Sequence, residues 1–171
     1  MSNIFVVSDT HFNHENILKF LDKDGKTFRN FSGTEEMNEL MIERWNKVVK
    51  EKDKVYHLGD VYFGPNKEAE NILRRLNGKK RLVVGNHDSL KDPVLHRYFQ
   101  KIMLWRFFKE NKLILTHVPI HQGHIGKADY NVHGHIHEKK SPSELYKCVC
   151  VEHINYTPIH IDDIVKLKTH V

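Results

Sequence analysis

Short apolar runs alternate with segments of helical periodicity in the first half of the chain. The apolar runs cover residues 3–8, 54–60 and 80–88, and they have the length and composition of strands. The two segments between them, residues 34–50 and 67–78, repeat apolar side chains at the spacing of an amphipathic helix. This β-α-β-α-β order predicts an α/β core whose strands are at least partly parallel.

Further local features fill in this first half. Residues 14–21 are expected to form a short helix, and residues 22–33 a polar loop. Thr34 or Ser32 is expected to cap the next helix, since hydroxyl side chains accept from free backbone N–H groups at helix starts. Trp45, on the apolar side of that helix, is expected to be a core anchor.

The second half is richer in strand-like segments. Residues 101–119 are expected to form two strands around a "KENK" turn, and residues 128–137 a strand that runs into a loop. Residues 146–154 and 157–167 suggest a closing strand and a terminal element. We find no internal repeat, low-complexity tract or linker, so residues 1–171 are expected to form a single domain.

Composition places the chain among globular proteins. Hydrophobic residues make up 39% of 171 residues, and the net charge of +5 fits an anionic substrate or nucleic acid. We see neither an apolar run long enough to span a bilayer nor a signal-peptide pattern, so a soluble, cytoplasmic protein without a membrane partner is expected. Cys148 and Cys150 are expected to be reduced, half-buried thiols rather than a disulfide or metal ligands.

Carboxylate, amide and imidazole side chains gather immediately after the predicted strands. In open α/β sheets the strand ends converge, and ligands bind there. Any one of these residues has an ordinary structural explanation, since Asp and Asn often form turns. Five clusters at five strand ends indicate a shared site: Asp9 and His11; Asp60; Asn86, His87 and Asp88; His117; His135 and His137.

The spacing within these clusters suits metal ligation. In an extended backbone, residues i and i+2 project to the same side, so Asp9 and His11 would aim at one point, as would His135 and His137. A glycine precedes three of the clusters and permits sharp turns or close approach of the backbone (Gly59, Gly85 and Gly134). Oxygen and imidazole ligands suit Mn, Fe or Zn, whereas a closed structural zinc site favours Cys.

This set of motifs resembles the calcineurin-like metallophosphoesterases, and in particular their small bacterial and phage-type members. The motifs stand in the family's order across residues 9–137: Asp9-x-His11, Gly59-Asp60, Gly85-Asn86-His87-Asp88, His117 and Gly134-His135-x-His137. The resemblance implies a four-layer αββα sandwich, in which two mixed β-sheets pack face to face and are flanked by helices.

The resemblance also implies a binuclear metal centre. One divalent ion would be held by Asp9, His11 and His137, a second by Asn86, His117 and His135, and Asp60 would bridge both. Mn²⁺ is the expected metal, with Fe, Ni or Zn as alternatives. A metal-bound hydroxide would attack the phosphorus without a covalent enzyme intermediate. His87, held by Asp88, would face the substrate phosphate and protonate the leaving oxygen.

These roles predict a metal-dependent phosphoester hydrolase. The favoured substrate is a phosphodiester of a nucleotide, cyclic nucleotide or nucleic-acid end. Alternatives are a phosphomonoesterase of the same mechanism, a catalytically silent metal-binding module, and a nucleic-acid-binding protein with steeply salt-dependent affinity. Two residues outside the motifs are candidate substrate contacts. His14 would touch substrate or cap a helix, and Arg29, anchored by Phe28 and Phe31, would bind phosphate or lie at the surface.

Overall fold

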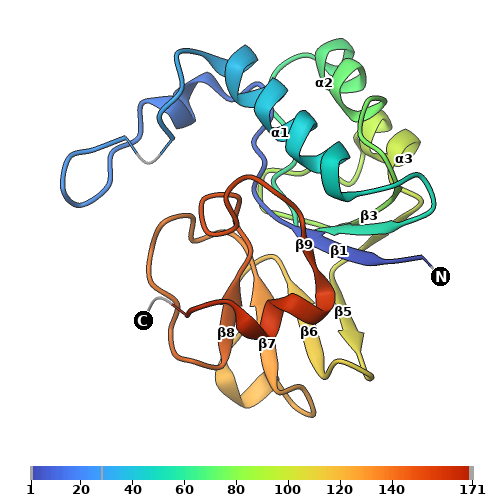
Figure 1. The fold of residues 1–171 in the computed structure, drawn as a ribbon, viewed down its shortest axis with the longest axis vertical. Helices are drawn as coiled ribbons and strands as arrows, with labels where there is room; N and C mark the ends of the chain where they lie inside the picture. The colour runs from blue at the N-terminus through green and yellow to red at the C-terminus, as the bar shows by residue number, and fades with distance from the viewer. Residues whose placement is uncertain (1, 28, 170–171) are drawn as a thin grey trace.

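The first of two β-sheets carries the N-terminal half of the chain. A computed structural model describes residues 2–27 and 29–169, so Phe28 lies outside the described residues (Figure 1). The strand order of this sheet is β4-β3-β2-β1-β9. β1 to β4 run parallel and β9 is antiparallel to β1. The strands are β1 (Ile4–Val7), β2 (Lys54–His57), β3 (Lys79–Val83), β4 (Lys101–Met103) and β9 (Ile159–His160).

The second sheet is formed by the C-terminal half, in the order β5-β6-β7-β8. β5 and β6 are antiparallel, whereas β6, β7 and β8 run parallel. Both sheets are therefore mixed, which confirms that part of the predicted sandwich. The strands are β5 (Trp105–Phe108), β6 (Leu113–Thr116), β7 (Tyr130–His133) and β8 (Tyr146–Cys148).

Three α-helices lie together on the outer side of the first sheet: α1 (Thr34–Val48), α2 (Asn66–Leu73) and α3 (Pro93–Tyr98) (Figure 1). α1 buries Met37, Met41 and Trp45 along one side, and Trp45 Nε1 donates to Asn77 O at 3.0 Å. The prediction that Trp45 anchors the core is confirmed.

The start of α1 differs from the prediction. Its N-cap is Gly33, and no side chain there caps the helix. Ser32 lies one residue too early to be the cap. Its backbone N–H and its hydroxyl group both donate to Glu36 Oε2, each at 2.7 Å. The Glu36 side chain, rather than a serine or threonine oxygen, therefore ties the preceding loop to the first turn of the helix.

The second sheet is covered differently from the first. Its outer face carries the segment 117–129, which contains the 3₁₀-helix η2 (Gln122–His124). This segment is held by Tyr146, whose hydroxyl donates to Ile120 O at 2.7 Å, and by Asn131, whose Oδ1 accepts from Ile120 N at 3.0 Å. Within the described ranges the fourth layer thus consists of a loop and a 3₁₀ turn. Among those same residues, no helix has the length and apolar character needed to cross a bilayer.

Side chains from both sheets form one hydrophobic core. Tyr56 on β2 meets Phe108 on β5 edge to face, with ring centroids 5.1 Å apart. The 3₁₀-helix η3 (Ile161–Lys166) adds Ile161 and Ile164 to this core. A bridge between Ser8 and Cys150 joins the sheets beyond the end of β1. Cys150 and Cys148 are free thiols and fully buried, rather than half-buried as expected.

The segment 101–119 forms the two predicted strands around the "KENK" turn, since β5 and β6 pair antiparallel on either side of residues 109–112, but the first strand is shorter than expected. The first apolar stretch splits into β4, which pairs with β3 in the first sheet, and β5, which pairs with β6 in the second. The chain crosses between sheets at Leu104, which is 71% exposed. Periodicity cannot detect this crossing, because both pieces are apolar and extended. The expected helix at 14–21 is likewise reduced to the 3₁₀-helix η1 (Glu15–Leu18).

His57, at the end of β2, links the loops that follow β1 and β2. Its Nδ1 accepts from Gly59 N at 3.1 Å, which places the ring proton on Nε2, 2.9 Å from Thr10 Oγ1. The Thr10 hydroxyl in turn donates to Val61 O at 2.7 Å. Protonation of Nδ1 would remove the acceptor for Gly59. His57 is buried, with only 1% of its surface exposed.

This network predicts a specific acid sensitivity of the fold. Burial lowers the pKa of His57 to about 4, whereas an unfolded histidine titrates near 6.5. Between these values the unfolded chain binds a proton that the folded chain does not, so the unfolding free energy falls as pH falls from about 6.5 to about 4. Denaturant titrations of the metal-free protein at a series of pH values give the unfolding free energy as a function of pH. Between about pH 6.5 and about pH 4, the slope of this free energy against pH should be steeper for wild type than for His57→Gln, by the equivalent of about one proton per molecule. Equal slopes would contradict this account of the ring.

Candidate metal centre

The five clusters predicted at strand ends come together at one edge of the two sheets. The parallel strands β1, β2 and β3 deliver Asp9, Asp60 and Asn86 from the first sheet, and the ends of β6 and β7 deliver His117 and His135 from the second. Two groups have ligand atoms within 4.8 Å of one another: Asp9, His11 and Asp60, and Asp60, His117 and His135. Asp60 belongs to both groups.

Asp60 lies between the two halves of the site. Its Oδ2 is 3.7 Å from His11 Nε2 and 3.5 Å from His117 Nε2. On the second side, Asn86 Oδ1 lies 2.8 Å from His117 Nε2 and 2.9 Å from His135 Nδ1. His117 Nδ1 donates to Leu58 O at 2.7 Å, so its Nε2 is left as an electron-pair donor.

Asp9 organises the other half. Its Oδ1 lies 3.7 Å from His11 Nε2 and 3.8 Å from His137 Nε2. Its Oδ2 is held by Ser8 Oγ at 2.5 Å and His135 N at 2.8 Å. Among the described residues, Asp9 Oδ1 and His11 Nε2 are buried polar atoms without a hydrogen-bond partner. Such atoms are costly unless something else satisfies them, and a divalent cation would do so.

The protonation states suit cation binding. Burial lowers the pKa of His11 to about 4, so its ring is neutral at pH 7. Burial raises the pKa of Asp9, but the neighbouring rings of His11, His137 and His117 hold it below its usual range. Burial also raises the pKa of Asp60, a cost that adjacent cations would offset.

The ligand side chains converge for a different reason from the one predicted. Five of the seven residues have left-handed backbone conformations, with φ of 56° at Asp9, 48° at His11, 56° at Asp60, 70° at His135 and 51° at His137. The expected extended i, i+2 geometry is therefore wrong. Non-glycine residues rarely adopt positive φ, and such strain is concentrated at functional sites.

Two glycines permit the loops to approach closely. A Cβ on Gly134 would collide with Ser8 Oγ and Asp9 Oδ2, and a Cβ on Gly85 would collide with the backbone and carboxylate of Asp60. Neither glycine has a positive φ. They serve close packing against the Asp9 and Asp60 carboxylates rather than a turn that only glycine can make.

Asp88 does not hold His87 as expected. Its Oδ2 accepts from Asp60 N at 2.9 Å and Gly85 N at 2.8 Å, and its Oδ1 accepts from Val61 N at 3.0 Å. The carboxylate therefore clamps the loops after β2 and β3 together. It is a positioning group rather than a direct catalytic one.

His87 reaches the site from the same loop. Its ring is exposed, and its centroid lies 5.1 Å from that of Phe63 and 6.0 Å from that of His11. The backbone N–H of His87 donates to Asp60 Oδ1 at 2.9 Å. The ring is thus fixed beside the ligand cluster and open to solvent, although the sequence-based partner Asp88 is not what fixes it.

Arg29 is neither at the surface nor available to a phosphate, so both predicted roles are wrong. Its side chain is fully buried behind the site. Nη2 donates to Asp9 O at 2.5 Å, Nη1 to Thr10 O at 2.8 Å, and Nε to Glu152 Oε1 at 2.6 Å. Arg29 therefore holds the strained turn at Asp9 from behind.

Glu152, which sequence reasoning missed, joins this support to the metal ligands. Its Oε1 lies 3.2 Å from His137 Nδ1, an arrangement that turns His137 Nε2 toward Asp9. Burial raises the pKa of Glu152, but the charge of Arg29 and the hydrogen bond with His137 lower it to about 2. A glutamate inside the apolar segment 146–154 was the available signal, because buried carboxylates need partners.

Cys150 also lies beside the ligand cluster, a contact that sequence reasoning did not predict. With Asp9 and His137 it forms a third group of closely spaced ligand atoms. Its Sγ lies 3.3 Å from Asp9 Oδ2, to which it donates. Burial raises the pKa of this thiol well above its usual value, so it remains a protonated hydrogen-bond donor behind Asp9.

His14 lies at the entrance of the site. It occupies the N-cap position of η1, but its side chain makes no capping hydrogen bond, so the capping role is wrong. Its Nδ1 is 2.9 Å from His11 Nδ1, and its ring stacks on Phe63 at a centroid distance of 3.8 Å. Contact of His14 with substrate stays a prediction.

Comparison with known proteins places this arrangement in context. A model of the calcineurin-like phosphoesterase superfamily domain matches residues 2–152, a range that includes every ligand candidate and Glu152. An uncharacterised protein of Methanocaldococcus jannaschii is 36% identical over 178 residues, covering 98% of this chain and 92% of that protein. The Gene 66 protein of Mycobacterium phage L5 is 24% identical over 217 residues, covering 100% and 96%.

The fold is shared with a solved structure. A protein of unknown function from Aquifex aeolicus superposes with a TM-score of 0.75 and 29% sequence identity. The similarity covers 98% of this chain and 100% of that one. The two-sheet fold is therefore shared along essentially the full length of both chains.

The Glu152 contact generates a prediction about metal affinity. Glu152→Gln keeps an oxygen that accepts from Arg29 but removes the charge that orients His137. We expect the affinity for the ion that His137 would hold to fall by about 10- to 100-fold, as for other outer-shell partners of histidine ligands. Calorimetric titration with Mn²⁺ measures it, with the exposed Glu51→Gln as the matched control. Unchanged affinity in a folded Glu152→Gln protein would show that Glu152 serves the fold alone.

Proposed function

Since this chain belongs to the calcineurin-like phosphoesterase superfamily, we propose that it is a phosphodiesterase. Its substrate would be a phosphodiester of a nucleotide, cyclic nucleotide or nucleic-acid end. The superfamily consists of metal-dependent phosphoester hydrolases. The observation that carries the proposal is the position of Asp60 in two groups of ligand atoms at once. One carboxylate shared by two ligand groups is the geometry that two adjacent cations require.

The residues divide between two ions. Asp9, His11 and His137 would hold the first, His117, His135 and Asn86 the second, and Asp60 both. The two partnerless buried atoms, Asp9 Oδ1 and His11 Nε2, support this fit. Mn²⁺ is the proposed metal. When bound, the ions would supply positive charge for the phosphate oxygens and make a water molecule acidic enough to act as nucleophile.

The chain's own groups would orient the ester and manage the leaving group. His87 lies at the open side of the ligand cluster, with its backbone tied to Asp60. Its imidazolium would give a proton to the leaving alkoxide. Asp88 keeps the loops of Asp60 and His87 in register.

The burial of Arg29 supports a diester over a monoester. A monoester carries about one more negative charge than a diester at neutral pH. Arg29 was the arginine expected to bind the phosphate, but its guanidinium instead donates hydrogen bonds to Asp9 O, Thr10 O and Glu152. Arg29 is therefore not available to neutralise the substrate phosphate. A singly charged diester requires less neutralisation than a monoester.

The first test is Mn²⁺-dependent hydrolysis of bis(p-nitrophenyl) phosphate beside p-nitrophenyl phosphate. We expect activity that favours the diester and is removed by chelation. Asp60→Asn should lower the rate by on the order of 100-fold or more, because both ions are disturbed. The exposed Asp163→Asn is the matched control and should leave the rate unchanged.

Other outcomes point to other functions. Preference for the monoester would make the chain a phosphomonoesterase of the same mechanism. Two bound ions without hydrolysis of these esters or of natural nucleotides would identify a silent metal-binding module. Nucleic-acid affinity that needs no metal and falls steeply with salt would favour the nucleic-acid-binding alternative.

The proton donor is tested separately. His87→Ala should retain both ions and lower the rate by about 10²- to 10⁴-fold for an alkyl leaving group. The loss should be smaller for p-nitrophenolate, which leaves without help from an acid. Elemental analysis together with rates for the two leaving groups decides the point. Loss of metal, or equal losses for both leaving groups, would refute the assigned role.

A further inference from the structure

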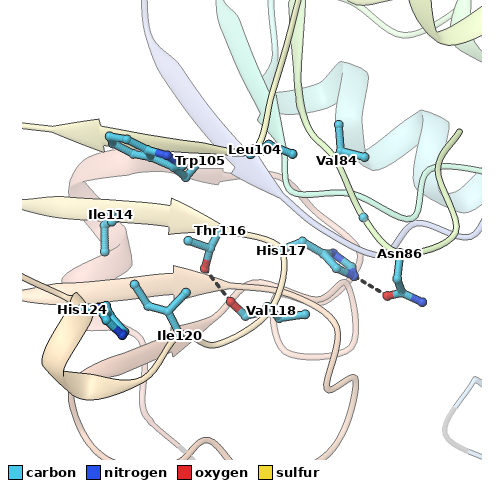
Figure 2. Close-up of a pocket in the computed structure, with 11 residues that line it drawn as sticks. Val84, Asn86, Leu104, Trp105, Ile114, Thr116, His117, Val118, Ile120 and His124 are labelled. Carbon is cyan, nitrogen blue, oxygen red and sulfur yellow. Dashed lines mark hydrogen bonds between the residues drawn. The ribbon is translucent and has the colours of Figure 1, made fainter. Parts of the chain in front are cut away.

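An apolar hollow opens directly beside the second half of the metal centre. Its volume is about 630 Å³, which is within the range of small-molecule sites. Figure 2 shows Asn86 and His117 at one end, Leu104 and Trp105 along one side, and Ile120 and His124 opposite. Because Asn86 and His117 also belong to the ligand cluster, the hollow and the metal centre form one continuous site.

The apolar side chains in the hollow are unusually exposed. Leu104 is 71% exposed, Trp105 59% and Val118 43%. The cause lies in the fold. Leu104 stands where the chain crosses between sheets, and Trp105 pairs with Thr116 on the outer face of β5 and β6, where no α-helix covers the described residues. Large apolar side chains gathered at a concave site mark a ligand surface.

The polar groups of Thr116 and Ile120 in the wall are already satisfied within the protein. Thr116 Oγ1 donates to Val118 O at 2.6 Å, as drawn in Figure 2. Both backbone groups of Ile120 are bonded, its N–H to Asn131 Oδ1 and its carbonyl to the Tyr146 hydroxyl. The wall therefore favours a flat apolar surface over a strongly hydrogen-bonding group. An exposed indole is the side chain best suited to stack on a planar ring.

We propose that the hollow takes a planar aromatic group of nucleobase size, carried by the ester whose phosphate lies at the metal centre, with Trp105 as its stacking platform. This assignment rests on the proposed function and narrows its substrate class to aromatic, above all nucleoside, phosphate esters. The continuity of hollow and ligand cluster at Asn86 and His117 argues for one small ligand that spans both. The same continuity argues against a second copy of the chain as the occupant, because its surface would have to enter a concavity that reaches the metal ligands.

Binding of three probes to the Mn²⁺-loaded protein tests the proposal by calorimetry. Adenosine 5′-monophosphate, ribose 5-phosphate and inorganic phosphate share the phosphate and differ in the base. We expect adenosine 5′-monophosphate to bind about tenfold or more tightly than ribose 5-phosphate. Trp105→Ala should remove most of that difference and leave inorganic phosphate unaffected. Trp105→Phe should retain part of it, and Val165→Ala, exposed on η3, all of it.

Tryptophan emission gives an independent signal. The chain has two tryptophans, and Trp45 is 1% exposed whereas Trp105 is 59% exposed. Adenosine 5′-monophosphate should therefore change the emission of Trp105, and ribose 5-phosphate should not. Emission that instead depends on protein concentration without ligand would show that a second copy covers the hollow, and would overturn the proposal.

The outcomes separate this proposal from the hydrolase assignment. Hydrolysis of diesters, with Trp105→Ala weakening all three probes equally or none, would overturn the aromatic site and leave the hydrolase intact. A base preference that depends on Trp105, in a protein that hydrolyses no ester, would support the aromatic site and count against the hydrolase.

Discussion

The metal centre depends on strained backbone turns that two charged side chains clamp in place. Asp9, His11 and Asp60 are held in left-handed conformations that non-glycine residues avoid. Two charged side chains oppose this strain from behind. Arg29 binds the carbonyls of Asp9 and Thr10, and Asp88 binds the amides of Asp60, Val61 and Gly85. Each is a charge-assisted contact to backbone, which is stronger than a neutral hydrogen bond.

The two clamps also distribute charge around the site. Arg29 would be an uncompensated buried cation without Glu152, and Glu152 reaches onward to His137. The guanidinium of Arg29 is therefore paired with the carboxylate that orients His137, and it does not face the cleft. Asp9 is supported by donors on one oxygen only, so its other oxygen faces the imidazoles of His11 and His137. The same hydrogen bonds thus hold the ligand side chains rigid and leave their electron-pair donors facing the cleft.

The amino-acid sequence predicts the ligands far better than their support. Strand ends are visible as apolar runs that stop at Asp9, Asp60 and Asn86, and parallel strands bring such ends together. The split of segment 101–119 between two sheets leaves no periodic signal, because both pieces are extended and apolar. The burial of Arg29 and the role of Glu152 depend on a contact between residues 123 positions apart, which local patterns do not encode.

The antiparallel pairing of β1 with β9 sets the order in which the molecule can be assembled. Phe5 lies opposite His160, so one side of the first strand is open until residue 160 has been synthesised. The contacts that support Asp9 likewise form only after Cys150 and Glu152 have been synthesised, since Cys150 bonds to Asp9 directly and Glu152 pairs with Arg29, which binds Asp9 O. Contacts of this sequence separation form slowly, because the loop entropy must be overcome before they stabilise anything. On the ribosome, the nascent chain would therefore gain its full metal affinity only after residues 150–160 have emerged.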